Sequence, residues 1–232
     1  MKTRYGIKGD YLMCCNQFWV HKDHKTLFSA LALLRERGIR PQLVCTGAAE
    51  DARHPDYFNS LTRFLAEHGL AGQITILGLI PRADQIQLLR GAAGVIQPSL
   101  FEGWSTVIED CRLLGKSVVY SDIQVHLEQD IVGGAPFKAG NAESLAEVLA
   151  ARLPAMRSTA DTVAEEQALH AAYQTRRLFG LEISNMVKHA MDTNKHRNQS
   201  AAHVEPARAQ SGMPLPTQEL TGRNSYKVKG VQ

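Results

Sequence analysis

The feature that most constrains the fold is an alternation of short apolar runs with longer segments of helical periodicity. Runs that predict strands lie at 11–15, 42–46, 73–77, 95–96 and 117–120, with a sixth, short one at 136–137. Helical patterns lie at 24–37, 56–68, 82–90, 105–114, 141–153 and 160–192, the last two ranges forming three helices. Strands separated by helices in this way favour right-handed βαβ units and a parallel sheet.

The strand-like runs are continuously apolar rather than alternating in polarity, as in 11–15. That pattern is typical of strands with helices on both faces. We therefore predict an α/β protein with a Rossmann-like, doubly wound parallel sheet. The pattern places a linker-like segment at 1–10, the α/β domain at 11–192 and a basic tail at 193–232, which we predict to be disordered because small and polar residues dominate it.

The net charge of +3 is unevenly distributed along the chain. Residues 195–232 hold six Lys or Arg and two Glu, a formal charge of +4, so the remaining body carries −1. A body without a basic excess gives no electrostatic support to nucleic-acid binding. The tail could be attracted to anionic lipid at a membrane surface, although an inert, solvated tail is the simpler explanation.

The four cysteines, at 14, 15, 45 and 111, lie in apolar segments and follow neither a zinc-binding spacing nor a disulfide framework. We expect reduced, buried thiols and, with no apolar leader and no membrane-spanning run, a cytoplasmic protein. His21 and His24 have no third ligand beside them, so we expect no metal site.

Polar loops follow several predicted strands, at the carboxyl edge where open α/β sheets bind ligands. Lys22 lies just before a helix start, so its ammonium and the helix dipole would point at one spot. Such an arrangement suits phosphate, and the alternative is a solvated loop with an exposed lysine. The loop lacks G-x-G-x-x-G, which removes the main support for an NAD-dependent dehydrogenase.

The segment from Phe101 to Glu109 joins the fourth strand to the next helix. Glu102 and Glu109 could each accept two hydrogen bonds from a vicinal diol of a sugar or a ribose. Thr106 and Glu109 also match the capping box T-x-x-E, which would give Glu109 a structural role instead. Trp104 is more often a packed aromatic than a platform for a sugar.

Two further loops are expected at the same edge. Gly78–Pro81 could contact a base, although a turn that starts a helix at Pro81 explains it as well. His126, after the fifth strand, is as readily a hydrogen-bonded structural histidine as a site residue. Four polar loops at one edge predict a ligand site there more strongly than any single loop does.

These motifs occur in a characteristic order. They are Lys22, then Gly78-Leu79-Ile80, then Phe101-Glu102-Gly103-Trp104 with Glu109, then Gly115-Lys116-Ser117-Val118-Val119 and Ser121-Asp122. In that order they resemble the C-terminal half of the retaining family-4 glycosyltransferases, also called glycosyl transferases group 1, whose fold is the glycosyltransferase B type. The resemblance covers roughly residues 5–192.

The resemblance implies a domain that binds a nucleoside-diphosphate sugar for retaining transfer of a hexose, without a metal or another cofactor. Lys22 would neutralise the donor diphosphate and Glu102 would contact the transferred sugar, as the catalytic pair. Glu109 would hold the ribose hydroxyls, and Leu79 and Ile80 would flank the base. The remaining donor contacts implied are backbone groups at Gly103, Trp104, Ser105 and Thr106.

The chain departs from the family pattern in two places. Six residues separate Glu102 from Glu109 where the family has seven, and one residue inside a helix rotates a side chain by about 100°. Gln17 stands where many family members have an Arg, which removes one cation from the phosphate site. The chain also begins where the resemblance puts the interdomain linker, so we expect either a donor-binding fragment or a subunit that needs a separate acceptor-domain protein.

Two alternatives stay open. The chain could be a truncated, non-catalytic nucleotide-binding or interaction module. It could also be a nucleotide-sugar epimerase-like protein, to which the block from Glu102 to Glu109 is less suited. By family analogy alone the pathway would be polysaccharide assembly, where lipid-linked acceptors would bring the protein to a membrane surface.

Overall fold

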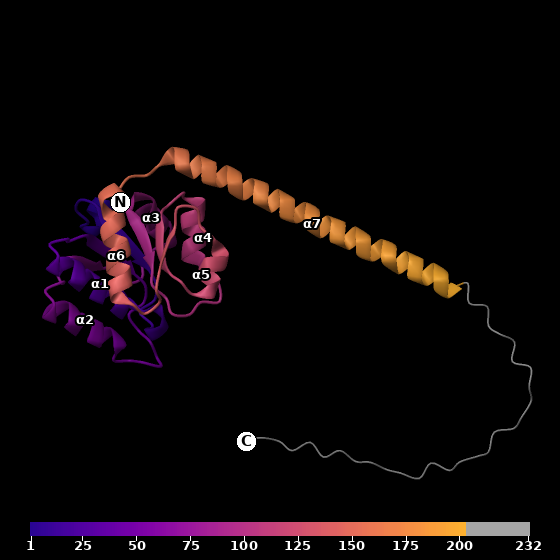
Figure 1. The fold of residues 1–232 in the computed structure, drawn as a ribbon. Coiled ribbons are helices and arrows are strands. Elements are labelled where there is room, and N and C mark those ends of the chain that lie inside the picture. The colour runs from indigo at the N-terminus through magenta and orange to yellow at the C-terminus, as the bar shows by residue number, and fades with distance from the viewer. Residues whose placement is uncertain (203–232) are drawn as a thin grey trace, which may run out of the picture. The chain divides into compact units, whose positions relative to one another are not determined.

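The computed structural model describes residues 1–202, with the backbone alone for 195–202 (Figure 1). Most of the expected tail lies outside these residues, so its disorder and its attraction to a membrane stay predictions. Contacts divide the chain into one unit from Met1 to Phe179 and a second that starts at Gly180. The first unit contains the whole sheet.

Six strands form one sheet, and every neighbouring pair is parallel. They are β1 (Tyr11–Cys15), β2 (Gln42–Thr46), β3 (Ile74–Ile76), β4 (Gly94–Gln97), β5 (Val118–Ser121) and β6 (Ala135–Phe137). The spatial order is β3-β2-β1-β4-β5-β6, which is the order of a doubly wound nucleotide-binding sheet. The predicted fold class is therefore confirmed, including the short sixth strand.

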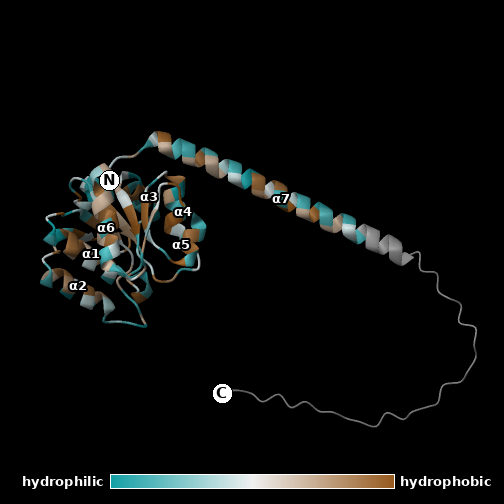
Figure 2. Cartoon of the chain, in the orientation of Figure 1, coloured by the Kyte–Doolittle hydropathy of each residue, from teal (hydrophilic) through white to brown (hydrophobic). Residues whose placement is uncertain are grey.

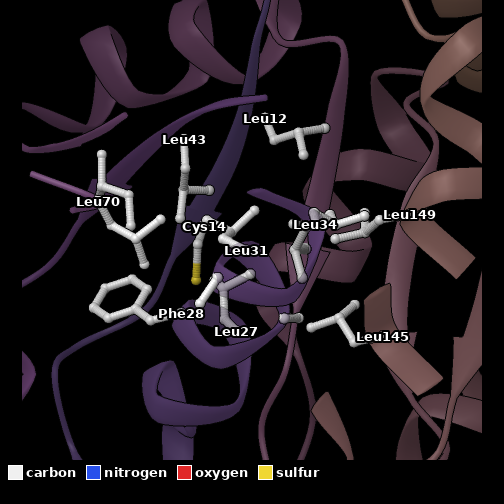
Figure 3. Packing of buried hydrophobic residues seen from close by; sticks show 14 of the residues in the cluster. Leu12, Cys14, Leu27, Phe28, Leu31, Leu34, Leu43, Leu70, Leu145 and Leu149 are labelled. Atoms are coloured by element: carbon white, nitrogen blue, oxygen red, sulfur yellow. The ribbon is translucent and has the colours of Figure 1, made fainter. Parts of the chain in front are cut away.

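Helices cover both faces of this sheet (Figure 1). They are α1 (His24–Glu36), α2 (Tyr57–Glu67), α3 (Arg82–Gly91), α4 (Thr106–Leu113), α5 (Gln124–Gln129) and α6 (Ala142–Arg152). The chain also contains α7 (Thr162–Ala202) and 3₁₀ turns at Lys2–Tyr5 (η1), Val20–Lys22 (η2) and Leu153–Ala155 (η3). On β1, Leu12 and Cys14 pack with α1, α2 and α6, and Figure 3 shows several of these side chains. Tyr11 and Met13 pack on the opposite face, with α3 and α4. Both faces of the central strand are thus buried, which explains its continuously apolar sequence.

The four cysteines are all buried and form no disulfide in the described chain, in agreement with the expectation of buried thiols. No helix within residues 1–202 is both long enough and apolar enough to cross a bilayer.

The last helical region differs from the prediction of two helices between 160 and 192. The structure has one helix, α7, that runs from Thr162 to Ala202 and so passes the expected boundary at 193. An isolated glycine such as Gly180 costs a helix only about 1 kcal/mol relative to alanine, which does not by itself end it. Apolar and polar residues alternate along the coloured part of α7 in the view of Figure 2.

The start of α7 is attached to α3 within the first unit. Arg90 donates two hydrogen bonds to the carboxylate of Glu165, at 2.7 and 2.8 Å. Gly115 lies against the same turn, where a Cβ would come within 2.9 Å of backbone atoms of Ala164.

The expected linker-like segment at 1–10 is tied to the domain. It contains η1, and the Tyr5 hydroxyl donates to the carboxylate of Asp84 at 2.6 Å. Arg4 forms an ion pair of 2.8 Å with the same carboxylate. Asp84 is buried at the start of α3, so these contacts fix the approach of the chain to β1.

Candidate functional site

The sheet order reverses between β1 and β4, and the loops that follow these two strands border a cavity of about 200 Å³. Open α/β sheets bind ligands in the crevice outside the strand ends at such a point. The cavity is lined by Cys15, Asn16, Gln17, Trp19, Lys22, Gln97, Glu102, Trp104, Ser105, Thr106 and Val107. Another cavity of about 250 Å³ lies at the amino ends of β1 and β2, but none of the predicted site residues lines it.

Lys22 and Glu102 meet in this cavity although 80 residues separate them along the chain. Lys22 ends η2, and Asp23 then caps α1 by accepting a hydrogen bond of 3.2 Å from the Thr26 amide. The ammonium of Lys22 lies 2.6 Å from Oε1 of Glu102, and their side chains are only 14% and 9% exposed. An ammonium carries three N–H donors, so Lys22 keeps donors for a ligand while it holds the carboxylate.

Glu102 is oriented by neutral donors as well. Gln97 Nε2 and Ser99 Oγ each donate to Glu102 Oε1 at 2.8 Å, and Asn16 Nδ2 donates to Gln97 Oε1 at 3.0 Å. Asn16, Gln97 and Ser99 are buried. Buried, mutually hydrogen-bonded side chains hold a fixed geometry, so the carboxylate is presented to the cavity in one orientation.

The N-terminus of α4 supplies a second positive element. Ser105 caps this helix and its hydroxyl accepts from the Ile108 amide at 3.4 Å. Within the described chain the amides of Thr106 and Val107 donate to no protein acceptor. Both residues line the cavity that contains Lys22, so an ammonium and two unpaired helix amides converge there. This combination suits an anion such as phosphate.

Gln17 also lines the cavity, but its side-chain oxygen accepts a hydrogen bond from the Ala48 amide. It therefore ties the loop after β1 to the loop after β2. Gly47 allows these loops to approach, because its φ is +139° and a Cβ there would overlap the carbonyl group of Asn16.

Glu109 lies one turn further along α4 than Ser105, outside the cavity lining. Its Oε1 accepts from Gln129 Nε2 at 2.8 Å and its Oε2 accepts from Arg112 Nε at 3.2 Å. The reciprocal capping box is not formed, because Ser105 rather than Thr106 caps the helix.

The structure brings Gln17, Lys22, Glu102, Trp104, Ser105 and Thr106 together around the cavity. Leu79, Ile80, Gly103 and Glu109 do not line it. Leu79 is 73% exposed at the end of β3, two strands away from β1. The expectation of a packed Trp104 is wrong, since its side chain is 53% exposed at the cavity.

Two histidines near the site have pKa values below the ordinary value of 6.5. Burial, and next the Lys22 ammonium, lower the pKa of His21. Burial also lowers the pKa of His126, whose Nδ1 lies 3.0 Å from the Ser121 carbonyl oxygen and so carries the proton. Among the described residues no group of three His, Cys, Asp or Glu side chains is arranged to hold a metal ion.

Sequence reasoning missed Asn16, Gln97, Ser99, Arg112 and Gln129, which position the predicted residues. Gln97 carried a usable signal, since a buried polar residue at the end of an apolar strand needs a partner. Gln129 and Arg112 carried no signal in the sequence, because their contacts join the end of α5 to α4 and depend on how these two helices pack.

Comparison with protein families gives a match that covers more than half of the chain. The sequence profile described as Glycosyl transferases group 1 matches residues 9–153. A comparison with curated proteins finds no match.

Many solved structures share the fold. HepE of Anabaena in complex with UDP superposes with a TM-score of 0.65 at 22% identity, over 81% of this chain and 51% of that chain. A glycosyltransferase of Rickettsia africae gives 0.61 at 22% identity, over 75% and 45%. The C-terminal domain of a group 1 glycosyl transferase (LpcC) from Francisella tularensis gives 0.58 at 17% identity, over 74% and 87%. The chain thus spans about half the length of the first two and most of a C-terminal domain.

Proposed function

The chain belongs to the glycosyl transferases group 1, and on that premise we propose that residues 11–192 form the half that binds a nucleoside-diphosphate sugar for retaining glycosyl transfer. The observation that carries the proposal is the contact of 2.6 Å between Lys22 and Glu102 beside the two unpaired amides at the N-terminus of α4. A nucleotide sugar offers an anion and a set of hydroxyls on neighbouring atoms, and this cavity offers cationic donors beside a carboxylate acceptor.

The diphosphate would bind at Lys22 and at the amides of Thr106 and Val107. These donors would stabilise the negative charge that grows on the diphosphate as the bond to the sugar breaks, which is a main source of catalytic rate. No metal ion is needed for that neutralisation. Glu102 would accept hydrogen bonds from hydroxyls of the transferred sugar, and Trp104 would border it.

Glu109 would hold the ribose hydroxyls one turn along α4, and Leu79 and Ile80 would flank the base. HepE of Anabaena has been solved with UDP and with UDP-glucose, which supports a uridine nucleotide as the first donor to try. In a retaining reaction of this kind the donor's own phosphate assists departure and accepts the proton of the acceptor hydroxyl.

Transfer also needs the acceptor hydroxyl held against the anomeric carbon, and that positioning supplies a large part of the rate. Because this chain spans about half of its first structural neighbours, we propose that a second domain, in the same or in a separate polypeptide, supplies the acceptor side.

Calorimetric titration tests the donor site. UDP, GDP and ADP, followed by UDP-glucose, are titrated into the wild type, Lys22→Ala and Glu102→Gln. We expect one diphosphate to bind with a Kd of roughly 0.01–1 mM. Lys22→Ala should weaken the binding of this diphosphate at least about tenfold, because a charged hydrogen bond to phosphate is lost. Glu102→Gln should weaken the binding of the nucleotide sugar but not that of the nucleoside diphosphate without a sugar.

The matched control is Lys25→Ala, which removes an exposed lysine three residues after Lys22, in the first turn of α1. An equal loss of diphosphate affinity in both lysine variants would indicate a general attraction between charges rather than a specific contact with Lys22. If no nucleotide binds to the folded wild type, the donor site is wrong and a non-catalytic interaction module becomes the leading function.

A further inference from the structure

The side chain of Gln129 connects two residues of the donor site, although nothing in the proposed function requires it. Gln129 is the last residue of α5 and is 3% exposed. Its Oε1 accepts from the Ser105 amide at 3.3 Å, and its Nε2 donates to the Ser105 carbonyl at 2.9 Å. The same Nε2 donates to Glu109 Oε1 at 2.8 Å. The Gln129 side chain thus donates two hydrogen bonds, to Ser105 and to Glu109, and accepts one from Ser105.

Arg112 completes the arrangement from the other side of the carboxylate. Its Nε donates to Glu109 Oε2 at 3.2 Å, and its guanidinium also donates to the backbone carbonyls of Gln129 and Asp130. Each oxygen of Glu109 therefore has one protein donor. A carboxylate oxygen accepts two hydrogen bonds, so both oxygens can still accept from a ligand.

Without Gln129 the Glu109 side chain, which is 35% exposed on the surface of α4, would be held only by the 3.2 Å contact from Arg112 and would be ordered less tightly. A glutamate that must be ordered when a ligand binds loses affinity through side-chain entropy. The contact to Ser105 matters equally, because Ser105 caps the helix whose first amides face the cavity. The buried side-chain amide of Gln129 thus fixes the position of the Glu109 carboxylate relative to the N-terminus of α4.

We propose that Gln129 is the positioning residue that holds Glu109 in register with the N-terminus of α4, so that ribose and diphosphate of one nucleotide can bind together. The proposal rests on the proposed function of this site. It also accounts for the short spacing between Glu102 and Glu109, because the orientation of Glu109 is set by a partner outside α4 rather than by helix geometry alone.

The test is discrimination between ribose and 2′-deoxyribose. The Kd values of UDP and 2′-deoxy-UDP, or of the GDP or ADP pair if that base binds better, are measured for the wild type, Glu109→Ala, Gln129→Met and the double variant. A fold-specific spectrum by near-ultraviolet circular dichroism checks each protein. We expect the wild type to prefer ribose by about tenfold or more, and Glu109→Ala and Gln129→Met each to bring that ratio close to one.

The double variant should have the same ribose preference as either single variant, because Gln129 acts only through the contact that Glu109 makes with the ribose. A merely structural role would lower the melting temperature and leave the ribose ratio unchanged. Gln124→Leu is the matched control, since Gln124 is an exposed glutamine on the same helix. If Gln129→Met does not fold, Gln129→Asn replaces it, because it keeps a neutral amide at this buried position but is one methylene too short to reach both Ser105 and Glu109.

The outcomes separate the inference from the proposed function. A wild type that prefers ribose and a Gln129 variant that keeps this preference would overturn the inference and leave the donor site intact. A wild type that binds UDP without preferring ribose would overturn the ribose contact of Glu109 and the role of Gln129. A wild type that binds none of the diphosphates would overturn the proposed function and this inference with it.

Discussion

At the scale of single residues, the ion pair between Lys22 and Glu102 is a weak source of stability. Partly buried charges lose hydration that their mutual attraction only partly returns. The pair persists here because Gln97 and Ser99 donate to the same carboxylate oxygen. An ammonium held in this way is oriented before a ligand arrives, which lowers the entropic cost of binding.

His126 predicts a dependence of stability on pH. Burial lowers its pKa in the folded chain below the ordinary value of 6.5, so the unfolded chain binds a proton first as the pH falls. Stability should therefore be fully present above about pH 6.5 and decrease as the pH drops below it. Tyr120, Ser121, Glu102 and Lys22 are the groups near the ring that the structure identifies.

The measurement is urea unfolding of the wild type and His126→Gln at pH 7.5 and 5.5. The wild type should lose more free energy of unfolding between the two pH values than the variant does. An equal loss in both proteins would show that other groups cause the pH dependence.

At the scale of elements, the site depends on how closely the loops after β1 and β2 approach. The Gly47 amide donates to the Gly78 carbonyl at 2.9 Å, and the Phe18 amide donates to the Ala48 carbonyl at 2.9 Å. Backbone bonds of this kind join the ends of β1, β2 and β3. They set the height of the loop that carries Gln17 and Lys22 above the sheet.

Gly47→Ala should disrupt this approach, because a Cβ would overlap the Asn16 carbonyl at a φ that L-residues rarely adopt. We expect a loss of unfolding free energy above about 2 kcal/mol, from overlap and backbone strain together. Gly78→Ala is the control, since its φ is +66° but no atom lies within 4 Å of its Cβ position. That variant should lose only about 1–2 kcal/mol, the penalty of the left-handed conformation. Similar losses in both variants, by urea unfolding, would mean that the close approach carries no energy of its own.

At the scale of the whole molecule, the first unit is held together by two apolar layers, one on each side of the sheet. Leu31 lies in the layer formed by α1, α6 and the sheet and is fully buried (Figure 3). The site residues are attached to strands that this packing fixes. Core packing therefore fixes the positions of the strands whose ends carry the cavity residues.

Leu31→Ala should cost about 2–5 kcal/mol of unfolding free energy, because it removes apolar contacts and leaves a cavity. Leu169→Ala, at a position on α7 that is 63% exposed, should change the free energy by less than about 0.5 kcal/mol. Chemical denaturation followed by circular dichroism compares the two variants. A small effect of Leu31→Ala would contradict the assignment of this layer as the core.

Much of the fold was predictable, because continuous apolar runs and helical periodicity are local properties of the chain. They predicted the strands, most helices and the parallel sheet, and the family pattern pointed to Lys22 and Glu102. The single helix α7 was not predicted, because one glycine is a weak helix terminator. The short helix α5 was not predicted either, since six residues carry too little periodicity to be recognised.

The amino-acid sequence alone determined the class of fold and the edge of the sheet at which polar loops gather, because hydrophobic burial follows the local pattern of side chains. Tertiary packing alone decided which side chains touch. It joined Lys22 to Glu102 across 80 residues, removed Leu79 from the cavity lining, and placed Gln129 between Ser105 and Glu109. Such contacts depend on strand order and loop approach, which are set by packing between distant segments and leave no mark on the local pattern.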